Sequence, residues 1–312
     1  MKVYQYTDQL PYFKNAVITI GTFDGVHQGH RQIIHHLKEV ANEVSGETVI
    51  ITFHPHPRSV IRHHEVQLIN TIDERIGLLD AAGIDNLVIV PFTDAFSQLT
   101  AEQYVEHFLV EHFHPHTIII GYDHRFGHGR KGDYRMLEAY AAKGFFQLRE
   151  IPEHLINNNT VSSTRIRKSI LHGEIDAANR LLGYPFFFSG TVVHGKKLGR
   201  ALGYPTANIE LSQSGKLVPS NGIYAVTATI GNISSAVYKG MMSIGIRPTI
   251  GGTERTIEVN LFNFDKDIYD QELRIYVHAY LRAEEKFQDL SLLTAQIDKD
   301  KEAALEVLSR FQ

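Results

Sequence analysis

Two histidines in one short segment are the side chains of this sequence best suited to chemistry on a phosphate. His27 and His30 close the segment 21–30, which follows an apolar run and precedes a stretch with helical periodicity. Its glycines allow a tight backbone, and the free N–H groups of a helix N-terminus favour an anion. A helix end contributes only about 0.3 to 1 kcal/mol toward an anion. Two imidazoles would add hydrogen bonds of roughly 1.5 to 3 kcal/mol each, which suits positioning and charge neutralisation in phosphoryl-type transfer.

Two further segments combine polar side chains with turn or helix-start signals. Ser162, Ser163 and Thr164 precede a helical stretch, so they could contact phosphate or act as an ordinary N-cap. Residues 190–208 hold glycines, basic residues and the oxygen donors Thr206 and Asn208, which suit a magnesium ion. Composition alone favours a loose surface hairpin for this second segment.

The first half of the chain alternates strand and helix signals, which predicts a doubly wound α/β fold with a parallel sheet. Capping boxes at Thr71 with Glu74 and at Thr100 with Gln103 predict two helix starts. Short runs rich in Val and Ile predict strands covered on both faces, at residues 16–20, 48–53, 86–92, 117–122 and 145–151. The histidine segment follows the first of these strands, which is the usual ligand position in such a sheet.

After the helical stretch 162–182 the pattern changes to Gly-spaced β segments, which predict a compact antiparallel barrel or sandwich. These segments are residues 186–193, 222–230, 236–246, 256–264 and 273–281. A last helix is expected from about 290 to 309. We therefore predict a first domain at 1–184 and a second at 185–312.

Length and composition fit this division. The 312 residues suit two domains, and the net charge of -4 gives no overall basic field for nucleic acid or anionic lipid. No cysteine is present, and neither a secretory leader nor an apolar span of about 20 residues is visible. We expect a cytoplasmic protein, with small-molecule substrates as its partners, that is a monomer or a weak homo-oligomer.

Taken together, the motifs of the first half resemble those of a known family. The segment Gly-x-Phe-Asp-Gly-x-His-x-Gly-His at 21–30 is similar to that of the bifunctional bacterial riboflavin kinase/FMN adenylyltransferases, also called FAD synthetases. The segments 53–57, 121–127 and 161–167 follow in the family's order, the last resembling the Ser-Ser-Thr-x-x-Arg motif of nucleotidylyltransferases. The resemblance implies a Rossmann-like N-terminal domain that transfers AMP from ATP to FMN, giving FAD and pyrophosphate.

The resemblance also implies roles for individual residues of the first domain. His27, His30 and Arg167 would be catalytic, with Arg167 on the leaving pyrophosphate, and Asp123 and Phe126 would bind flavin. ATP would contact Gly21, Phe23, Asp24, Gly29, His56, Ser162, Ser163 and Thr164. The family usually has an acidic residue where His54 stands and Phe where His124 stands, and the latter change removes apolar area.

In the second half, Gly-x-Pro-Thr-Ala-Asn at 203–208 is similar to the riboflavin-kinase signature. The resemblance implies a kinase-like antiparallel β-barrel with a terminal helix, which phosphorylates riboflavin to FMN with magnesium and ATP. Thr206 and Asn208 would coordinate the metal, Glu258 would be the general base, and Arg282 and Phe287 would bind flavin. ATP would contact Gly195, Lys197, Gly199, Gly203, Thr206 and Asn208. The family commonly has Asn, His, Asp and Gly where Ser243, Asn260, Asn263 and Asp270 stand.

Other functions stay open at this stage. The chain could be active only as an FMN adenylyltransferase with a structural or flavin-binding second domain, or it could be a flavin-sensing regulator without catalysis. The 18 histidines, several of them near 54–56, 62–64 and 107–116, also suggest a metal site, but we expect structural or solvent-facing roles for most of them.

Overall fold

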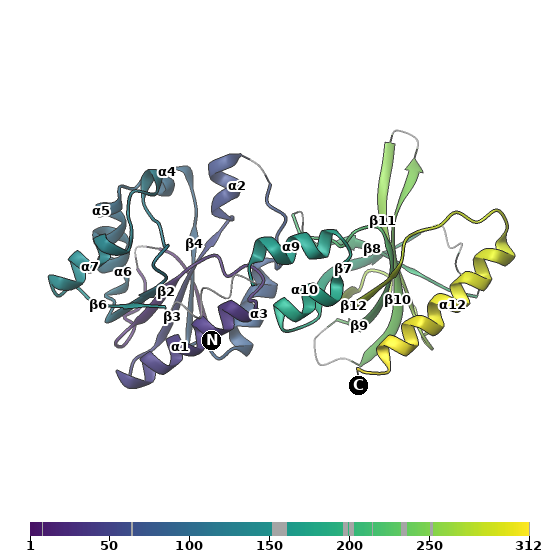
Figure 1. Ribbon diagram of the computed structural model, residues 1–312, viewed down its shortest axis with the longest axis horizontal. Helices are drawn as coiled ribbons and strands as arrows, with labels where there is room; N and C mark the ends of the chain where they lie inside the picture. Colours follow the sequence, from purple (N-terminus) through teal and green to yellow (C-terminus); the bar gives the residue numbers. More distant parts are fainter. Residues whose placement is uncertain are drawn as a thin grey trace. The chain divides into compact units, whose positions relative to one another are not determined.

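The computed structural model describes residues 1–7, 9–63, 65–151, 161–195, 199, 203–213, 215–231, 236–249 and 252–311 (Figure 1). They form two compact units, Met1–Ser163 and Thr164–Gln312. Across the described ranges, no helix is long and apolar enough to cross a membrane.

The first unit contains a six-stranded sheet with the order β1-β4-β3-β2-β5-β6, and every pairing is parallel. This confirms the predicted parallel fold and adds an edge strand, β1, that the pattern missed. The order reverses direction at the β2–β5 neighbours, which is where open α/β sheets bind ligands. The strands are β1 Lys2–Gln5, β2 Val17–Ile20, β3 Thr48–His54, β4 Asn86–Pro91, β5 Thr117–Ile120 and β6 Gln147–Glu150.

Helices cover both faces of this sheet, which explains why its central strands are apolar throughout. On one face, Ile50 and Leu87 pack with Leu37 of α1 (Gln28–Glu43) and Leu79 of α3 (Ile72–Ala81). On the other face, the sheet packs against the segment formed by α5 (Ala101–Gln103), η1 (Tyr104–Val110) and α6 (Glu111–Phe113), and against α7 (Tyr134–Ala142). Both predicted capping boxes, at Thr71 and Thr100, are present. The short helices α2 (Pro57–Arg62), α4 (Asp94–Ser97) and η2 (His128–Arg130) lie between these elements in the chain.

The second unit is built on a closed antiparallel barrel with the strand order β10-β11-β8-β7-β12-β9. Closure decides between the predicted barrel and sandwich. The strands are β7 Phe186–Val193, β8 Ala207–Leu211, β9 Gly222–Ile230, β10 Val237–Thr249, β11 Gly252–Leu261 and β12 Glu272–Arg282. The predicted last helix is α12 (Leu290–Leu308), which packs Ala304 and Leu308 against Met241 and Ala279 of the barrel.

Helices α9 (Ser163–Leu171) and α10 (Ile175–Leu182) group with the barrel, so the units divide earlier in the chain than the boundary predicted at 184. The reason is visible at Asn179 of α10. Its amide donates to the Val277 carbonyl at 2.9 Å and accepts from the Phe186 N–H at 2.7 Å. The functional boundary at 184 stays a prediction.

Candidate functional site

The rings of His27 and His30 lie face to face at the start of α1. Their centroids are 3.6 Å apart and their planes differ by 13°. His27 is the N-cap of α1, and its Nδ1 accepts the His30 N–H at 3.3 Å. Burial, the neighbouring His27 and then Arg75 hold the pKa of His30 well below its usual value. The His30 ring is therefore neutral at pH 7, and a bound anion would supply the charge that favours its protonation.

The loop that leads to these histidines has an uncommon backbone. Phe23, Gly25 and Val26 all have positive φ, at 48°, 93° and 33°. For phenylalanine and β-branched valine such a conformation costs on the order of 1 to 3 kcal/mol each, and it persists only where the surroundings impose it. The Phe23 ring packs 4.8 Å from the His30 ring. A Cβ on Gly21 would lie 3.2 Å from that same Phe23 ring, so a side chain there would need the ring to shift slightly.

Asp24 holds this loop in place. Its buried carboxylate accepts hydrogen bonds from the N–H groups of Ile69 at 3.2 Å and Asn70 at 3.0 Å, and lies 3.9 Å from buried Arg75. Ser163 donates its hydroxyl to the Asp24 carbonyl at 2.9 Å. The structure thus gives Asp24 a structural role, and its predicted contact with ATP stays a prediction. The hydrogen bond from Ser163 also connects the start of the Ser-Ser-Thr motif to the histidine loop.

The other segments predicted for the adenylyl site follow neighbouring strands. His56 comes after β3 and caps α2, where its Nδ1 accepts the Arg58 N–H at 3.1 Å. The segment 121–127 follows β5, which pairs with β2, so it begins at the same sheet edge as the histidine loop. Ser162, Thr164 and Arg167 lie around the start of α9; Thr164 and Arg167 belong to the second compact unit, and their roles stay predictions.

The predicted flavin residues of this domain differ sharply in exposure. Asp123 is exposed, whereas Phe126 is buried and stacks on Tyr104 with centroids 5.0 Å apart. The shown role of Phe126 is therefore packing, which fixes the segment on the η1 helix, and its contact with flavin stays a prediction. Between them, burial lowers the pKa of His124 to about 4, so this ring is neutral at pH 7.

In the second unit, the structure brings Thr206 and Glu258 together. The Thr206 hydroxyl donates to Glu258 with 3.0 Å between Oγ1 and Oε2. Asn208 of β8 pairs in register with Glu258 of β11, and its side chain lies against Gly195, where an added Cβ would come within 2.1 Å of the amide. Any side chain at residue 195 would therefore have to displace the Asn208 amide. The predicted metal-facing residues and the predicted base form one group.

A cavity of about 350 Å³ lies beside this group. Apolar residues predominate in its lining, and the polar ones are Thr206 and three charged residues of the segment 264–269, Asp265, Lys266 and Asp267. Antiparallel partners on neighbouring strands share a face, so Val259 faces the same way as Met242, while Glu258 faces the same way as Ser243. Val259 lines the cavity and Glu258 does not. The cavity and Glu258 thus lie on opposite faces of β11. Thr206 connects them, because it lines the cavity and also bonds to Glu258.

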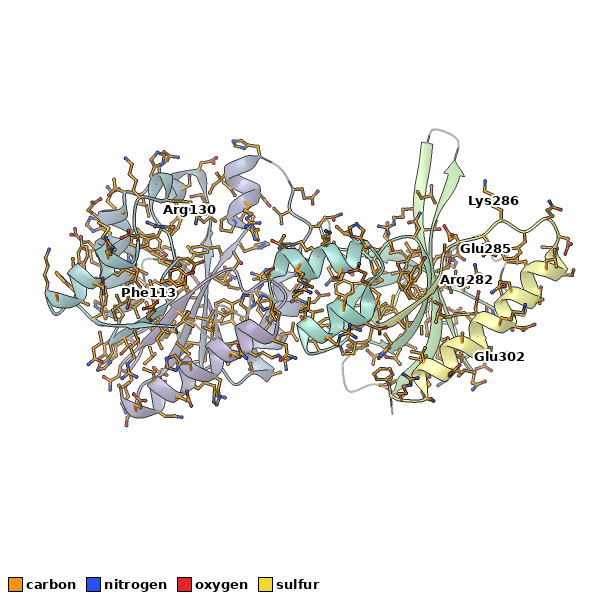
Figure 2. The ribbon with its side chains drawn as sticks, in the orientation of Figure 1. Phe113, Arg130, Arg282, Glu285, Lys286 and Glu302 are labelled. Atoms are coloured by element: carbon orange, nitrogen blue, oxygen red, sulfur yellow. The ribbon has the colours of Figure 1, made fainter. Side chains whose placement is uncertain are left out.

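The remaining residues predicted for the kinase site have mixed outcomes. Gly199 accepts the Tyr204 N–H at its carbonyl at 2.8 Å, and Gly203 has a φ of 80°, which favours glycine. Lys197 lies outside the described residues. Arg282, shown between the barrel and α12 in Figure 2, makes two hydrogen bonds of 2.7 Å to the carboxylate of Asp300 and lies 6.0 Å from the Phe287 ring. The Asp300 carboxylate raises the pKa of Arg282. In the structure, Arg282 holds α12 against the barrel through Asp300. Flavin binding by Arg282 and Phe287 stays a prediction.

The residues that the structure describes contain no cluster of three His, Cys, Asp or Glu side chains fit for a metal ion. A site built from Thr206 and Asn208 would fit magnesium, because that ion prefers hard oxygen donors and takes most other ligands from water and substrate phosphates. Among the described histidines of the rich segments, His107 contacts Glu111 at 3.0 Å and His116 contacts Thr117 at 2.9 Å, as expected for structural roles.

Sequence reasoning missed three residues that support these sites. Arg75 is buried against Asp24. The sequence signal that could have found it is a positively charged residue on the apolar face of a predicted helix, three residues after Ile72. Asn260 donates to the Pro205 carbonyl at 2.7 Å, and Asp298 of α12 accepts from the Tyr204 hydroxyl. No pattern in the sequence indicates these two long-range contacts.

Comparisons with known proteins cover both units. The FAD synthetase family model matches residues 10–165, and the riboflavin kinase family model matches residues 182–308. The bifunctional riboflavin kinase/FMN adenylyltransferase of Listeria monocytogenes is 35% identical over 292 residues, which is 92% of this chain and 91% of that protein. The Bacillus subtilis protein of the same description is 34% identical over 95% of this chain and 94% of its own. A crystal structure described as a macrolide-efflux protein from Streptococcus pneumoniae has a TM-score of 0.86 at 29% identity and covers 99% of both chains.

Proposed function

This chain belongs to the bifunctional riboflavin kinase/FMN adenylyltransferase family, and from that premise we propose that it converts riboflavin to FMN and FMN to FAD with ATP. The observation that carries the proposal is that each unit assembles the polar group its reaction requires. The stacked His27 and His30 lie at the sheet's switch point, and Thr206 bonds to Glu258 beside a cavity. A monofunctional enzyme or a sensor without catalysis is less consistent with two such groups.

For FAD formation, an oxygen of the FMN phosphate attacks the α-phosphorus of ATP, and the bond to the β-phosphate breaks to release pyrophosphate. His27, His30 and the start of α1 hold the triphosphate and neutralise charge as it develops. The strained 21–27 loop, fixed by Asp24 and Ser163, presents both rings without further reorganisation. Arg167 binds the leaving pyrophosphate, and Asp123 lies beside the flavin.

For FMN formation, the 5'-oxygen of riboflavin attacks the γ-phosphorus of ATP and ADP leaves. Glu258 accepts the hydroxyl proton. Thr206 and Asn208 would hold magnesium, which would supply charge neutralisation at the phosphates. The cavity of about 350 Å³ takes the nucleotide, because its apolar residues suit a base and Thr206, which bonds to Glu258, is among its lining residues. We place both reactions in the cytoplasm, in a monomer or weak homo-oligomer that needs no nucleic acid.

A chromatographic assay tests both reactions. Purified protein is incubated with magnesium and ATP plus either riboflavin or FMN, and the flavins are separated. We expect FMN and then FAD from riboflavin, and FAD from FMN. FAD from FMN with no product from riboflavin would eliminate the kinase, and the reverse result would eliminate the adenylyltransferase.

A further inference from the structure

Three consecutive residues of the Gly-x-Pro-Thr-Ala-Asn segment are each held by a side chain from elsewhere in the second unit. The Tyr204 hydroxyl bonds to Asp298 of α12, the Pro205 carbonyl accepts from Asn260 at 2.7 Å, and Thr206 donates to Glu258 at 3.0 Å. Glu258 and Asn260 are two residues apart on β11, so they project from the same face of the strand.

Asn260 is the middle of these three anchors and the least exposed to competition from water. Asn260 is only 6% exposed to solvent, so its side-chain amide must find hydrogen-bond partners within the protein. Proline has no N–H, so the carbonyl is the backbone group at residue 205 that can be tied down. Pairing of β8 with β11 begins only at Ala207 and Val259. The side chain of Asn260 thus replaces the ladder hydrogen bonds that the preceding residues lack.

The carbonyl of Pro205 belongs to the same planar peptide group as the nitrogen of Thr206. Fixing that carbonyl fixes the orientation of this peptide plane and the position of the Thr206 Cα, from which the side chain leaves the backbone. The Thr206 hydroxyl uses its proton on Glu258, which leaves its lone pairs free of that bond and available to a cation. A rotated peptide would move this oxygen away from both the carboxylate and the cavity.

We propose that Asn260 is a positioning residue of the kinase site: through the Pro205 carbonyl it sets the Thr206 hydroxyl for magnesium–nucleotide binding. The inference rests on the proposed kinase function. It also accounts for the Asn at a position where the resembling family commonly has His, because both side chains can offer an N–H to a carbonyl oxygen.

The test compares Asn260→Leu with wild type in the full-length chain, using riboflavin phosphorylation and calorimetric titration with ADP in the presence and absence of magnesium. Asn260→Leu should lower kcat at least about tenfold, because small misplacements of reacting groups have large effects on rate. It should also weaken Mg–ADP binding by about tenfold, with metal-free ADP binding and the KM for riboflavin within about twofold of wild type. Asn260→His should restore Mg–ADP binding.

Asn179→Leu is the matched control, since Asn179 also donates its amide to a backbone carbonyl in this unit but away from the Pro205–Thr206 segment. It should lower thermal stability and leave the magnesium dependence unchanged. Equal Mg–ADP binding by Asn260→Leu and wild type, or an equal loss in Asn179→Leu, overturns the proposal. If Asn260→Leu does not fold, Asn260→Ser decides on the same criteria. A wild-type chain that makes no FMN would instead refute the kinase function itself.

Discussion

The hydroxyl of Thr206 donates a hydrogen bond to the carboxylate of Glu258, with 3.0 Å between Oγ1 and Oε2. A residue that lines the cavity of about 350 Å³ and a residue that is expected to accept the riboflavin proton are therefore in direct contact. One hydroxyl can bind a cation through oxygen while it orients the base through its proton.

From this contact we expect Thr206→Ser to retain riboflavin phosphorylation within about threefold, because the hydroxyl remains, and Thr206→Val to lower kcat by about 10² or more, because an isosteric methyl replaces it. The measurement is FMN formation at saturating riboflavin. FAD formation from FMN in the same samples serves as the control and should not change. Full kinase activity in Thr206→Val would exclude both the metal contact and the positioning of Glu258.

His30→Ala should abolish FAD formation from FMN, with a loss of at least about 10²-fold, while FMN formation from riboflavin persists. His30 stacks on His27, and its buried Nδ1 has no hydrogen-bond partner in the described part of the chain, so removing the ring breaks no protein hydrogen bond at that atom. Both products are measured by chromatography. A folded variant that loses both activities would contradict the independence of the two sites.

Replacing Asp270 by glycine should stabilise the barrel unit by about 0.5 to 1 kcal/mol. Asp270 has a φ of 61°, and the left-handed conformation penalises a residue with a Cβ. Calorimetry of the full-length chain should show the transition of this unit about 2 °C higher. Asp265→Gly is the control: Asp265 has no positive φ, so glycine there should lower stability. A lower transition temperature in Asp270→Gly would refute the strain.

The stability of the barrel unit should fall as the pH is lowered from about 6.5 to 4. Burial lowers the pKa of His278 to about 4, and its Nε2 bonds to Thr227 at 2.8 Å. The unfolded chain takes up a proton below its usual pKa of about 6.5, whereas the folded chain does not. The contribution of His278 to the free energy of unfolding is therefore complete above pH 6.5. It is lost as the pH falls toward 4, by at most about 3 kcal/mol.

His278→Gln tests this explanation, since an amide can still bond to Thr227 but does not titrate. Calorimetry at pH 7.5 and 5 should show a smaller acid-induced shift for the barrel unit of the variant than for wild type. The N-terminal unit holds His124, whose pKa is also lowered to about 4, so its transition should stay acid-sensitive in both proteins. An undiminished shift of the barrel unit would assign its acid sensitivity to other groups.

The sequence by itself determined the class of both folds and the location of the two polar groups. The apolar strands of the first half and the Gly-spaced β segments of the second are local patterns, and motifs such as 21–30 and 203–208 need only neighbours in the chain to be recognised. Thr71 and Thr100 were predictable for the same reason, because a capping box closes within one helical turn.

Only the tertiary structure decided what each motif residue touches. The family resemblance implied ligand contacts for Asp24 and Phe126, and these stay predictions; the structure adds that the Asp24 carboxylate accepts from the backbone of residues 69 and 70 and that the Phe126 ring packs on Tyr104. Asn260 stood out in the sequence only as a departure from the family pattern and Asp298 gave no signal, although they hold Pro205 and Tyr204. The physical reason is that a side chain's hydrogen-bond partner depends on chain closure over tens of residues, whereas periodicity and motifs record only the local environment.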